Sequence, residues 1–240
     1  KFLRTRLGRL RRDIQRKIKG DRTLEAAFAP ALAKSAQIRL QRQNQRGRKL
    51  YSWHAPETEC IGKGKAHKPY EFGCKVSITT TNRRCKGGQF VLHAKAFHGN
   101  PYDGHTLKQV SEETQALMAE GRRIYIDKGY RGHKAPKPLR VFQSGQRRGV
   151  TAAIKRELQR RAAVEPVIGH MKSDGHLGRN FLKGILGDQV NAILAAVGHN
   201  FRLLLRWLRL VLRLIIHRLR GALVRTAITE HPPQALLLAS

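Results

Sequence analysis

The chain has 240 residues, with 48 Lys or Arg against 16 Asp or Glu, and its formal net charge is +32. That charge favours a polyanionic partner, foremost nucleic acid, because neutralised phosphates release their counterions; a genome-wide preference for Arg is the alternative explanation. The three cysteines include no C-x-x-C pair, which argues against a disulfide framework. No run of about 18 apolar residues occurs, so no transmembrane helix is expected, and no secretory signal opens the chain.

Residues 1–47 are predicted to form a helical arm or insertion. Apolar residues at spacings of three and four indicate a helix over residues 1–20. Asp21 is suited to cap a second helix, which Pro30 is expected to break or kink, so that a further polar helix follows over residues 31–45. The segment is either an arm that contacts DNA or a solvated insertion that packs one apolar stripe.

A basic loop and a hairpin are expected next. Residues 48–73 are irregular, and their Gly-rich run contains Lys63 and Lys65, which are suited to gripping phosphate. Residues 72–80 then alternate and contain β-branched side chains, and residues 89–97 read as a second strand after a turn. This pattern predicts two strands paired as an antiparallel hairpin. Cysteine and histidine residues in the loop match no zinc module in their spacing.

A short apolar strand over residues 123–126 ends at Asp127 and follows a helix that Asp103 or Thr106 is suited to cap. A carboxylate at the C-terminal end of a strand is well placed for chemistry, because open α/β sheets form their sites there. The ordinary alternative is a turn or cap residue. Residues 141–142 are a possible last short strand.

A helix is expected over residues 151–172, and it carries one acid among cations. Residues four and eleven positions after Arg161 return to its face, since each helical step turns about 100°, so Glu165 and Lys172 share its stripe. A carboxylate flanked by phosphate-binding groups suits a metal-dependent phosphodiester site, whereas a surface salt-bridge helix is the alternative. Pro166 suggests that the helix restarts or kinks at Glu165.

The last part of the chain is predicted to be a mostly apolar helix over residues 181–201 that runs into a basic helix. Five arginines of the basic helix fall on one stripe, which faces DNA or water in preference to a membrane; they are Arg202, Arg206, Arg209, Arg213 and Arg220.

Two motifs together resemble those of bacterial insertion-sequence transposases of the DDE type. The motifs are Asp127-Lys128-Gly129-Tyr130 and Arg161-x3-Glu165-x6-Lys172. More narrowly, the chain is similar to the group related to insertion sequences four and five, which residues 54–73 and 99–106 also resemble. The family signature has a Tyr where this chain has Leu158. The resemblance covers roughly residues 1–215.

The resemblance implies an α/β fold with a ribonuclease H-like mixed sheet flanked by helices, an N-terminal helical segment and C-terminal basic helices. The order strand, strand, helix, strand ending in Asp and helix bearing Glu is similar to that fold. The implied organisation is a helical segment over 1–47, a ribonuclease H-like catalytic domain over 48–220 and a flexible tail over 221–240.

The resemblance also implies a mechanism, in which three carboxylates hold two Mg²⁺ ions at the scissile phosphate. One ion activates water or the freed 3′-hydroxyl, and the other stabilises the leaving oxygen. Asp127 and Glu165 are the expected metal ligands and catalytic residues. The expected DNA-binding residues are Arg161, Lys172, Lys128, Arg131, Lys63 and Lys65. The implied partners are double-stranded DNA of the transposon ends and target and a possible second copy of the chain, in the bacterial cytoplasm on the nucleoid.

The first catalytic acid of the family is not recognised in this sequence. In the family it precedes the region that Lys1 opens, so the first strand and acid are expected to be missing. Two carboxylates hold two divalent ions poorly, and the chain as given is therefore expected to cleave DNA weakly or not at all. A catalytically dead DNA-binding remnant and a basic RNA-binding protein are the alternatives.

Overall fold

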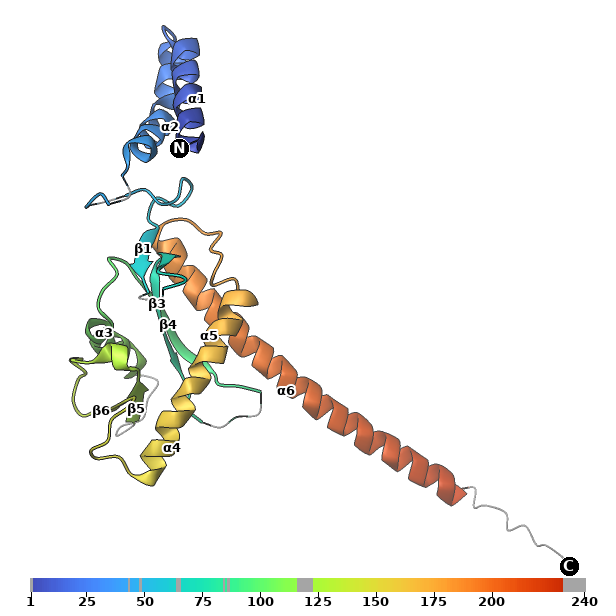
Figure 1. Ribbon diagram of the computed structural model, residues 1–240. Coiled ribbons are helices and arrows are strands. Elements are labelled where there is room, and N and C mark those ends of the chain that lie inside the picture. The colour runs from blue at the N-terminus through green and yellow to red at the C-terminus, as the bar shows by residue number, and fades with distance from the viewer. Residues whose placement is uncertain are drawn as a thin grey trace, which may run out of the picture. The chain divides into compact units, whose positions relative to one another are not determined.

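The computed structural model describes residues 2–42, 44–47, 49–63, 66–83, 85, 87–115 and 123–230, with side chains up to residue 221. They form a mixed α/β structure of helices and small sheets (Figure 1). The elements are α1 (Phe2–Ile18), α2 (Arg22–Leu40), β1 (Glu59–Gly62), β2 (Tyr70–Gly73), β3 (Lys75–Thr80), β4 (Val91–Phe97), α3 (Asp103–Gln115), β5 (Arg123–Ile126), the 3-10 turn η1 (Lys128–Tyr130), β6 (Arg140–Gln143), α4 (Ala152–Arg160), the 3-10 turn η2 (Arg161–Ala163), α5 (Val164–Ser173) and α6 (Gly184–Glu230). The α/β class expected from the sequence is confirmed.

The chain divides into two compact units, each assembled from segments that are distant in sequence. Unit 1 comprises Lys1–Val76, Ala96–Pro101 and Phe181–Val190. Unit 2 comprises Ser77–Lys95, Tyr102–Asn180 and Asn191–Ser240.

The helical start of the chain is largely as predicted. Asp21 caps α2, because its Oδ1 accepts hydrogen bonds from the backbone N–H groups of Thr23 at 2.9 Å and Leu24 at 3.0 Å. The expected break at Pro30 is wrong, since α2 continues through it to Leu40. Pro30 removes one helical N–H, but residues 21–30 are all exposed, so water can hydrogen-bond the carbonyl group that is left without a partner.

The strands that the structure describes pair in twos. β1 and β2 are antiparallel, β3 pairs with β4, and β5 and β6 are parallel. The predicted hairpin is present as β3 and β4, and the N–H of Thr81 donates to the carbonyl of Phe90 at 2.9 Å where the loop begins. Phe72, which was expected in the first hairpin strand, belongs to β2 and faces Cys60 of β1.

A side chain of α6 completes the edge of β4 in unit 2. Asn200 Oδ1 accepts the N–H of Val91 at 2.9 Å, and Asn200 Nδ2 donates to the carbonyl of Val91 at 2.8 Å. This amide therefore pairs with the backbone as a neighbouring strand would, which satisfies groups that would otherwise be exposed at the edge. His199 Nε2 donates to the carbonyl of Gln89 at 3.0 Å, and Phe90 packs edge-on against Trp207.

The core of unit 2 is formed by apolar side chains of β4, β5, α3, α4, α5 and α6. The buried residues are Val91, Ala94, Leu107, Val110, Ile126, Ile154, Val167, Met171, Ala192, Ala195, Ala196 and Leu203. Met171 and Ala192 are completely buried. Thr151 begins α4 as its N-cap, since its Oγ1 accepts the N–H of Ile154 at 3.3 Å.

The C-terminal region forms one helix, α6, in place of the two consecutive helices that were expected (Figure 1). Residues 221–230 are helical where a flexible tail was predicted, and residues 231–240 lie outside the described part. None of the helices within the described residues is long and apolar enough to cross a membrane.

Candidate active site

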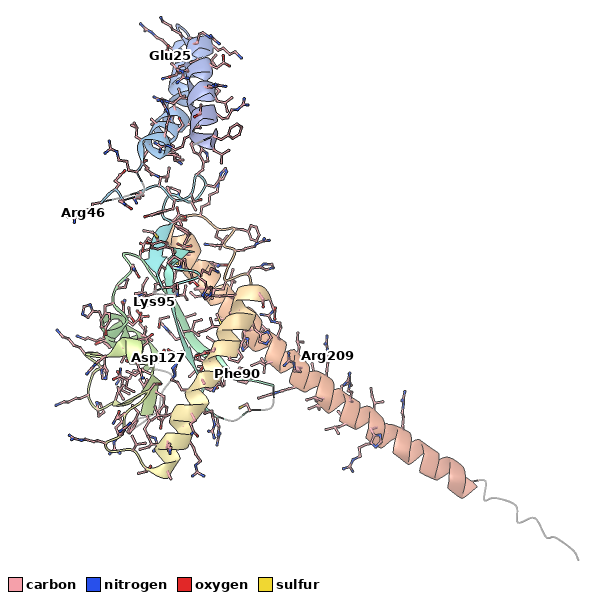
Figure 2. All side chains as sticks on the ribbon, viewed as in Figure 1. Glu25, Arg46, Phe90, Lys95, Asp127 and Arg209 are labelled. Atoms are coloured by element: carbon pink, nitrogen blue, oxygen red, sulfur yellow. The ribbon has the colours of Figure 1, made fainter. Side chains whose placement is uncertain are left out.

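Asp127 stands at the C-terminal end of β5, where the sequence predicted a carboxylate (Figure 2). Its Oδ1 accepts the N–H of Lys128 at 2.7 Å, so the side chain caps the 3-10 turn η1. Gln143 of the parallel neighbour β6 donates from Nε2 to the carbonyl of Lys128 at 3.0 Å. The end of β5 and the turn after it are therefore held in place by local hydrogen bonds.

Arg161 forms an ion pair with this carboxylate, since its Nη1 lies 3.2 Å from Asp127 Oδ1. The arginine side chain is only 16% exposed, whereas that of Asp127 is 60% exposed. The carboxylate thus has one oxygen engaged by Arg161 and Lys128 while most of the group faces solvent. An exposed carboxylate with a free oxygen can accept a hard cation.

Glu157 of α4 lies one helical turn before Arg161, and its contacts align α4 with β5. Its carboxylate accepts the hydroxyl of Tyr125 and lies 3.2 Å from Arg123 Nη2. Burial and the Glu157 carboxylate raise the pKa of Tyr125 to about 12. Four helical residues rise about 6 Å, and two strand residues span about 6.6 Å. The contact of Glu157 with Tyr125 and that of Arg161 with Asp127 therefore repeat at the same spacing along the helix and the strand.

The helical rod that contains Arg161 continues to Glu165. In Figure 1, α4 and α5 form one rod, with the 3-10 turn η2 between them and Glu165 in the first turn of α5. The predicted interruption near Pro166 is therefore present, and Pro166 occupies a first turn where its missing N–H costs little. Glu165 is exposed, and it lies one further turn along the rod beyond Arg161.

A second carboxylate, Asp103, lies beside the turn that follows Asp127. A Cβ atom on Gly129 would come within 2.8 Å of Asp103 Oδ2, so this carboxylate lies directly against the turn. Burial raises the pKa of Tyr130, and the nearby carboxylates of Asp103 and Asp127 add to the shift. The sequence indicated Asp103 only as a helix cap; it is the first residue of α3. Asp103 and the turn after Asp127 are far apart in the sequence, so no local spacing indicated that they lie side by side.

The predicted DNA-binding residues fall in both units. Lys128, Arg131 and Lys172 of unit 2 are exposed, as a phosphate contact requires. Lys63 of unit 1 forms an ion pair with Glu71 at 3.0 Å. Lys65 lies outside the described residues.

Asp127 and Glu165 are of the residue type that a divalent-metal site needs. Carboxylate oxygens are the ligands that Mg²⁺ prefers, and Asp127 and Glu165 are both exposed. Within the described part of the chain, the one group of three metal-ligating side chains that lie together is Cys74, His98 and Asp188 in unit 1. Neither Asp127 nor Glu165 belongs to a group of three such side chains among the described residues.

The family model for the transposase DDE domain matches residues 38–201, which is more than half of the chain. The chain belongs to the transposase DDE domain family. The matched range includes Asp127, Arg161 and Glu165 and the strand and helices on which they lie. Neither the curated proteins nor the solved structures contain a match to this chain.

Membership in this family gives the site a chemical context. DDE domains act in transposition on DNA substrates and use divalent metal ions. The transposase of the DDE type indicated by the sequence motifs is therefore confirmed. The basic composition is in keeping with a DNA substrate, because cationic side chains bind the phosphate backbone.

Sequence reasoning missed two features of this DDE domain. Glu157 sits one turn before Arg161 and carried no motif, although the i, i+4 spacing of two charged residues on a predicted helix was visible. The cluster of Cys74, His98 and Asp188 was also missed, because its members are too far apart in sequence to form a recognisable spacing.

Proposed function

We propose that this chain is a transposase that binds transposon-end DNA and catalyses metal-dependent strand cleavage and transfer, with Asp127 and Glu165 as two of its metal-ligating carboxylates. The observation that carries the proposal is the ion pair of Arg161 with Asp127 at 3.2 Å. It joins the two motifs, one at the end of β5 and one on the helical rod, within a single unit.

Each side chain has a defined role in this proposal. Asp127 and Glu165 hold divalent cations, with Mg²⁺ as the expected ion; when bound, such ions supply Lewis-acid activation of the scissile phosphate. Arg161 orients the Asp127 carboxylate and remains close to the phosphate that is cleaved. Lys172, exposed later on the same rod, contacts the DNA backbone by a charge-assisted hydrogen bond.

The turn after Asp127 extends the DNA-binding surface. Lys128 and Arg131 are both exposed and follow the carboxylate directly in the chain. Counterion release makes binding at such a surface strong at low salt and weak at high salt. Binding to transposon ends and to target DNA through these residues, with two copies of the chain holding two ends, completes the proposed arrangement.

A ribonuclease H-like catalytic domain of the group related to insertion sequences four and five is the fold we propose. The parallel pair β5–β6, the carboxylate after β5 and the following helix with Glu165 support it. Because neither Asp127 nor Glu165 belongs to a group of three ligating side chains among the described residues, we expect weak metal binding and correspondingly weak cleavage by this chain.

The proposal is tested with the full chain and supercoiled plasmid DNA in Mg²⁺ or Mn²⁺. We expect low but metal-dependent nicking that Asp127→Asn and Glu165→Gln each abolish. Glu112→Gln serves as the matched control, since Glu112 lies on α3 of the same unit and is half exposed. Equal nicking by wild type and both site variants would contradict the assignment.

A binding measurement keeps the test decisive if nicking is too slow to detect. In the presence of duplex DNA, Mn²⁺ should bind wild type at least tenfold more tightly than either site variant. Metal binding that depends on both carboxylates, without nicking, would indicate a DNA-binding remnant. Tighter binding of single-stranded RNA than of duplex DNA at the same salt concentration would instead favour the RNA-binding alternative.

A further inference from the structure

Unit 1 contains a cluster of side chains of the types that ligate transition metals. Cys74 lies between β2 and β3, His98 follows β4, and Asp188 lies in the second turn of α6. One ligand atom from each lies within 4.8 Å of the other two, and all three residues are half-buried. Three segments that are far apart in sequence therefore converge on one point.

The distance between two of these atoms fits one edge of a coordination tetrahedron. His98 Nε2 lies 3.3 Å from Asp188 Oδ2. Zinc–nitrogen and zinc–oxygen bonds of about 2.0–2.1 Å at tetrahedral angles place two such ligand atoms about 3.3 Å apart. His98 Nε2 is buried and has no hydrogen-bond partner among the described residues, although it is this close to the carboxylate. A metal ion bound by both groups would explain why the imidazole and the carboxylate lie this close without a hydrogen bond between them.

Glu59 of β1 lies on the other side of the imidazole. Its Oε1 is 3.7 Å from His98 Nδ1 and accepts the N–H of Gly99 at 2.5 Å. Metal-bound histidines usually present their second nitrogen to a carboxylate, which fixes the tautomer and the orientation of the ring. Glu59 therefore stands where a positioning residue for a zinc-bound His98 belongs.

We propose that Cys74 Sγ, His98 Nε2 and Asp188 Oδ2 form a zinc site in unit 1, oriented by Glu59 and separate from the proposed catalytic carboxylates. One sulfur, one nitrogen and one oxygen ligand suit Zn²⁺, which accepts all three types, and they suit Mg²⁺ poorly. The bound ion would tie the β2–β3 link, the end of β4 and the start of α6 together. Its role is structural, since no substrate-binding residue is involved.

The competing description is a network of hydrogen bonds without metal. Burial, together with the Asp188 and Glu59 carboxylates, raises the pKa of the Cys74 thiol to about 12, and the thiol donates a hydrogen bond to Asp188. Such a network also brings these groups together. The two descriptions differ in whether the full chain takes up a stoichiometric ion.

The test is a titration of the purified, chelator-treated full chain with Zn²⁺ and, separately, with Co²⁺. We expect one Zn²⁺ per chain, a raised melting temperature, and a thiolate-to-cobalt charge-transfer band. Cys74→Ser and Asp188→Asn should each lower the Zn²⁺ affinity at least tenfold, and Glu59→Gln should lower it about tenfold. The cobalt band should disappear in Cys74→Ser.

Two controls separate this site from others. Cys60→Ser changes a thiol of β1 in the same unit and should bind Zn²⁺ as wild type does. Asp127→Asn should also bind as wild type, which makes failure here distinguishable from failure of the proposed function. The proposal is overturned if the wild-type chain takes up no Zn²⁺, or if its Co²⁺ complex lacks the thiolate band. Both measurements use the wild-type chain and so do not depend on whether a variant folds. Equal affinity in wild type, Cys74→Ser and Asp188→Asn overturns it as well.

Discussion

Arg161 and Asp127 form an ion pair in which the cation is mostly buried and the carboxylate is mostly exposed. Their atoms Nη1 and Oδ1 are 3.2 Å apart. A buried arginine has few alternative positions, so it fixes the place of the carboxylate on the surface. The same positive charge stands close to any cation that Asp127 binds, and repels it.

Arg161→Ala should therefore raise the affinity of the chain for a divalent ion and lower its affinity for DNA. Loss of the like charge should strengthen Mn²⁺ binding several-fold, because a unit charge within about 5 Å of a divalent ion is only partly screened. Loss of a phosphate-binding guanidinium should weaken duplex DNA binding at low salt and reduce its salt dependence. Titration calorimetry for the ion and fluorescence anisotropy for DNA measure both. A parallel loss of both affinities would contradict this description of the pair.

Glu157 should contribute to stability through its contacts with β5. Glu157→Ala removes the acceptor of the Tyr125 hydroxyl and the partner of Arg123, which should cost about 1.5–3 kcal/mol. Glu157→Gln keeps an acceptor for Tyr125 and should cost less. Urea unfolding measures both, and Glu112→Ala is the control, since its exposed pair with Lys108 should contribute less than about 0.5 kcal/mol. Equal costs for the Ala variants of both glutamates would contradict the proposed alignment.

Asn200 should be important for the edge of β4. Asn200→Ala leaves the N–H and the carbonyl of buried Val91 without partners, which should destabilise the fold by about 2–4 kcal/mol. Asn191→Ala in the same helix is the control, because that side chain makes no hydrogen bond with another described residue. Hydrogen exchange at the Val91 amide should speed up in the first variant alone. Unchanged protection of that amide would show that the side chain does not complete the edge.

Cys74 should react slowly with alkylating reagents in the metal-free chain. Its pKa of about 12 leaves about 10⁻⁴ of the thiol ionised at pH 8, whereas an unfolded cysteine is about a quarter ionised. Because the thiol pKa is raised on folding, its contribution to stability is present below the unfolded value and is lost as pH rises toward 12. Asp188→Asn should speed alkylation, and mass spectrometry of iodoacetamide-treated chain measures it. Equal rates with and without the carboxylate would exclude Asp188 as a cause.

Local signals in the sequence predicted local structure well. Asp21 identified the start of α2 because capping depends on residues within one turn. Asp127 was placed at a strand end because the apolar run and the acid are adjacent. Pro30 misled because its cost in a helix depends on whether water reaches the affected carbonyl. That exposure is a property of the folded chain and is not visible in the sequence.

Relationships between distant residues were beyond the sequence. Nothing near Cys74 indicates that His98 and Asp188 converge on it. Asn200 has no sequence feature that predicts pairing with the backbone of Val91, because this depends on how α6 packs against β4. The motif that contains Arg161 was recognised, but its ion pair with Asp127 was not predicted, because that contact depends on how α4 is aligned against β5. Chain topology decides such contacts, and spacing along one element does not.

The most direct test of the proposed catalytic site is Fe²⁺-directed cleavage of the polypeptide in the presence of duplex DNA, mapped by mass spectrometry. Fe²⁺ that replaces the divalent ion generates hydroxyl radicals with peroxide and ascorbate, and these cut the chain near its ligands. Zn²⁺ is added to block the cluster of Cys74, His98 and Asp188. We predict cuts beside Asp127 and Glu165 that excess Mg²⁺ suppresses and that Asp127→Asn abolishes. Cuts that avoid both residues, or that persist in Asp127→Asn, would contradict the assignment of these carboxylates as metal ligands.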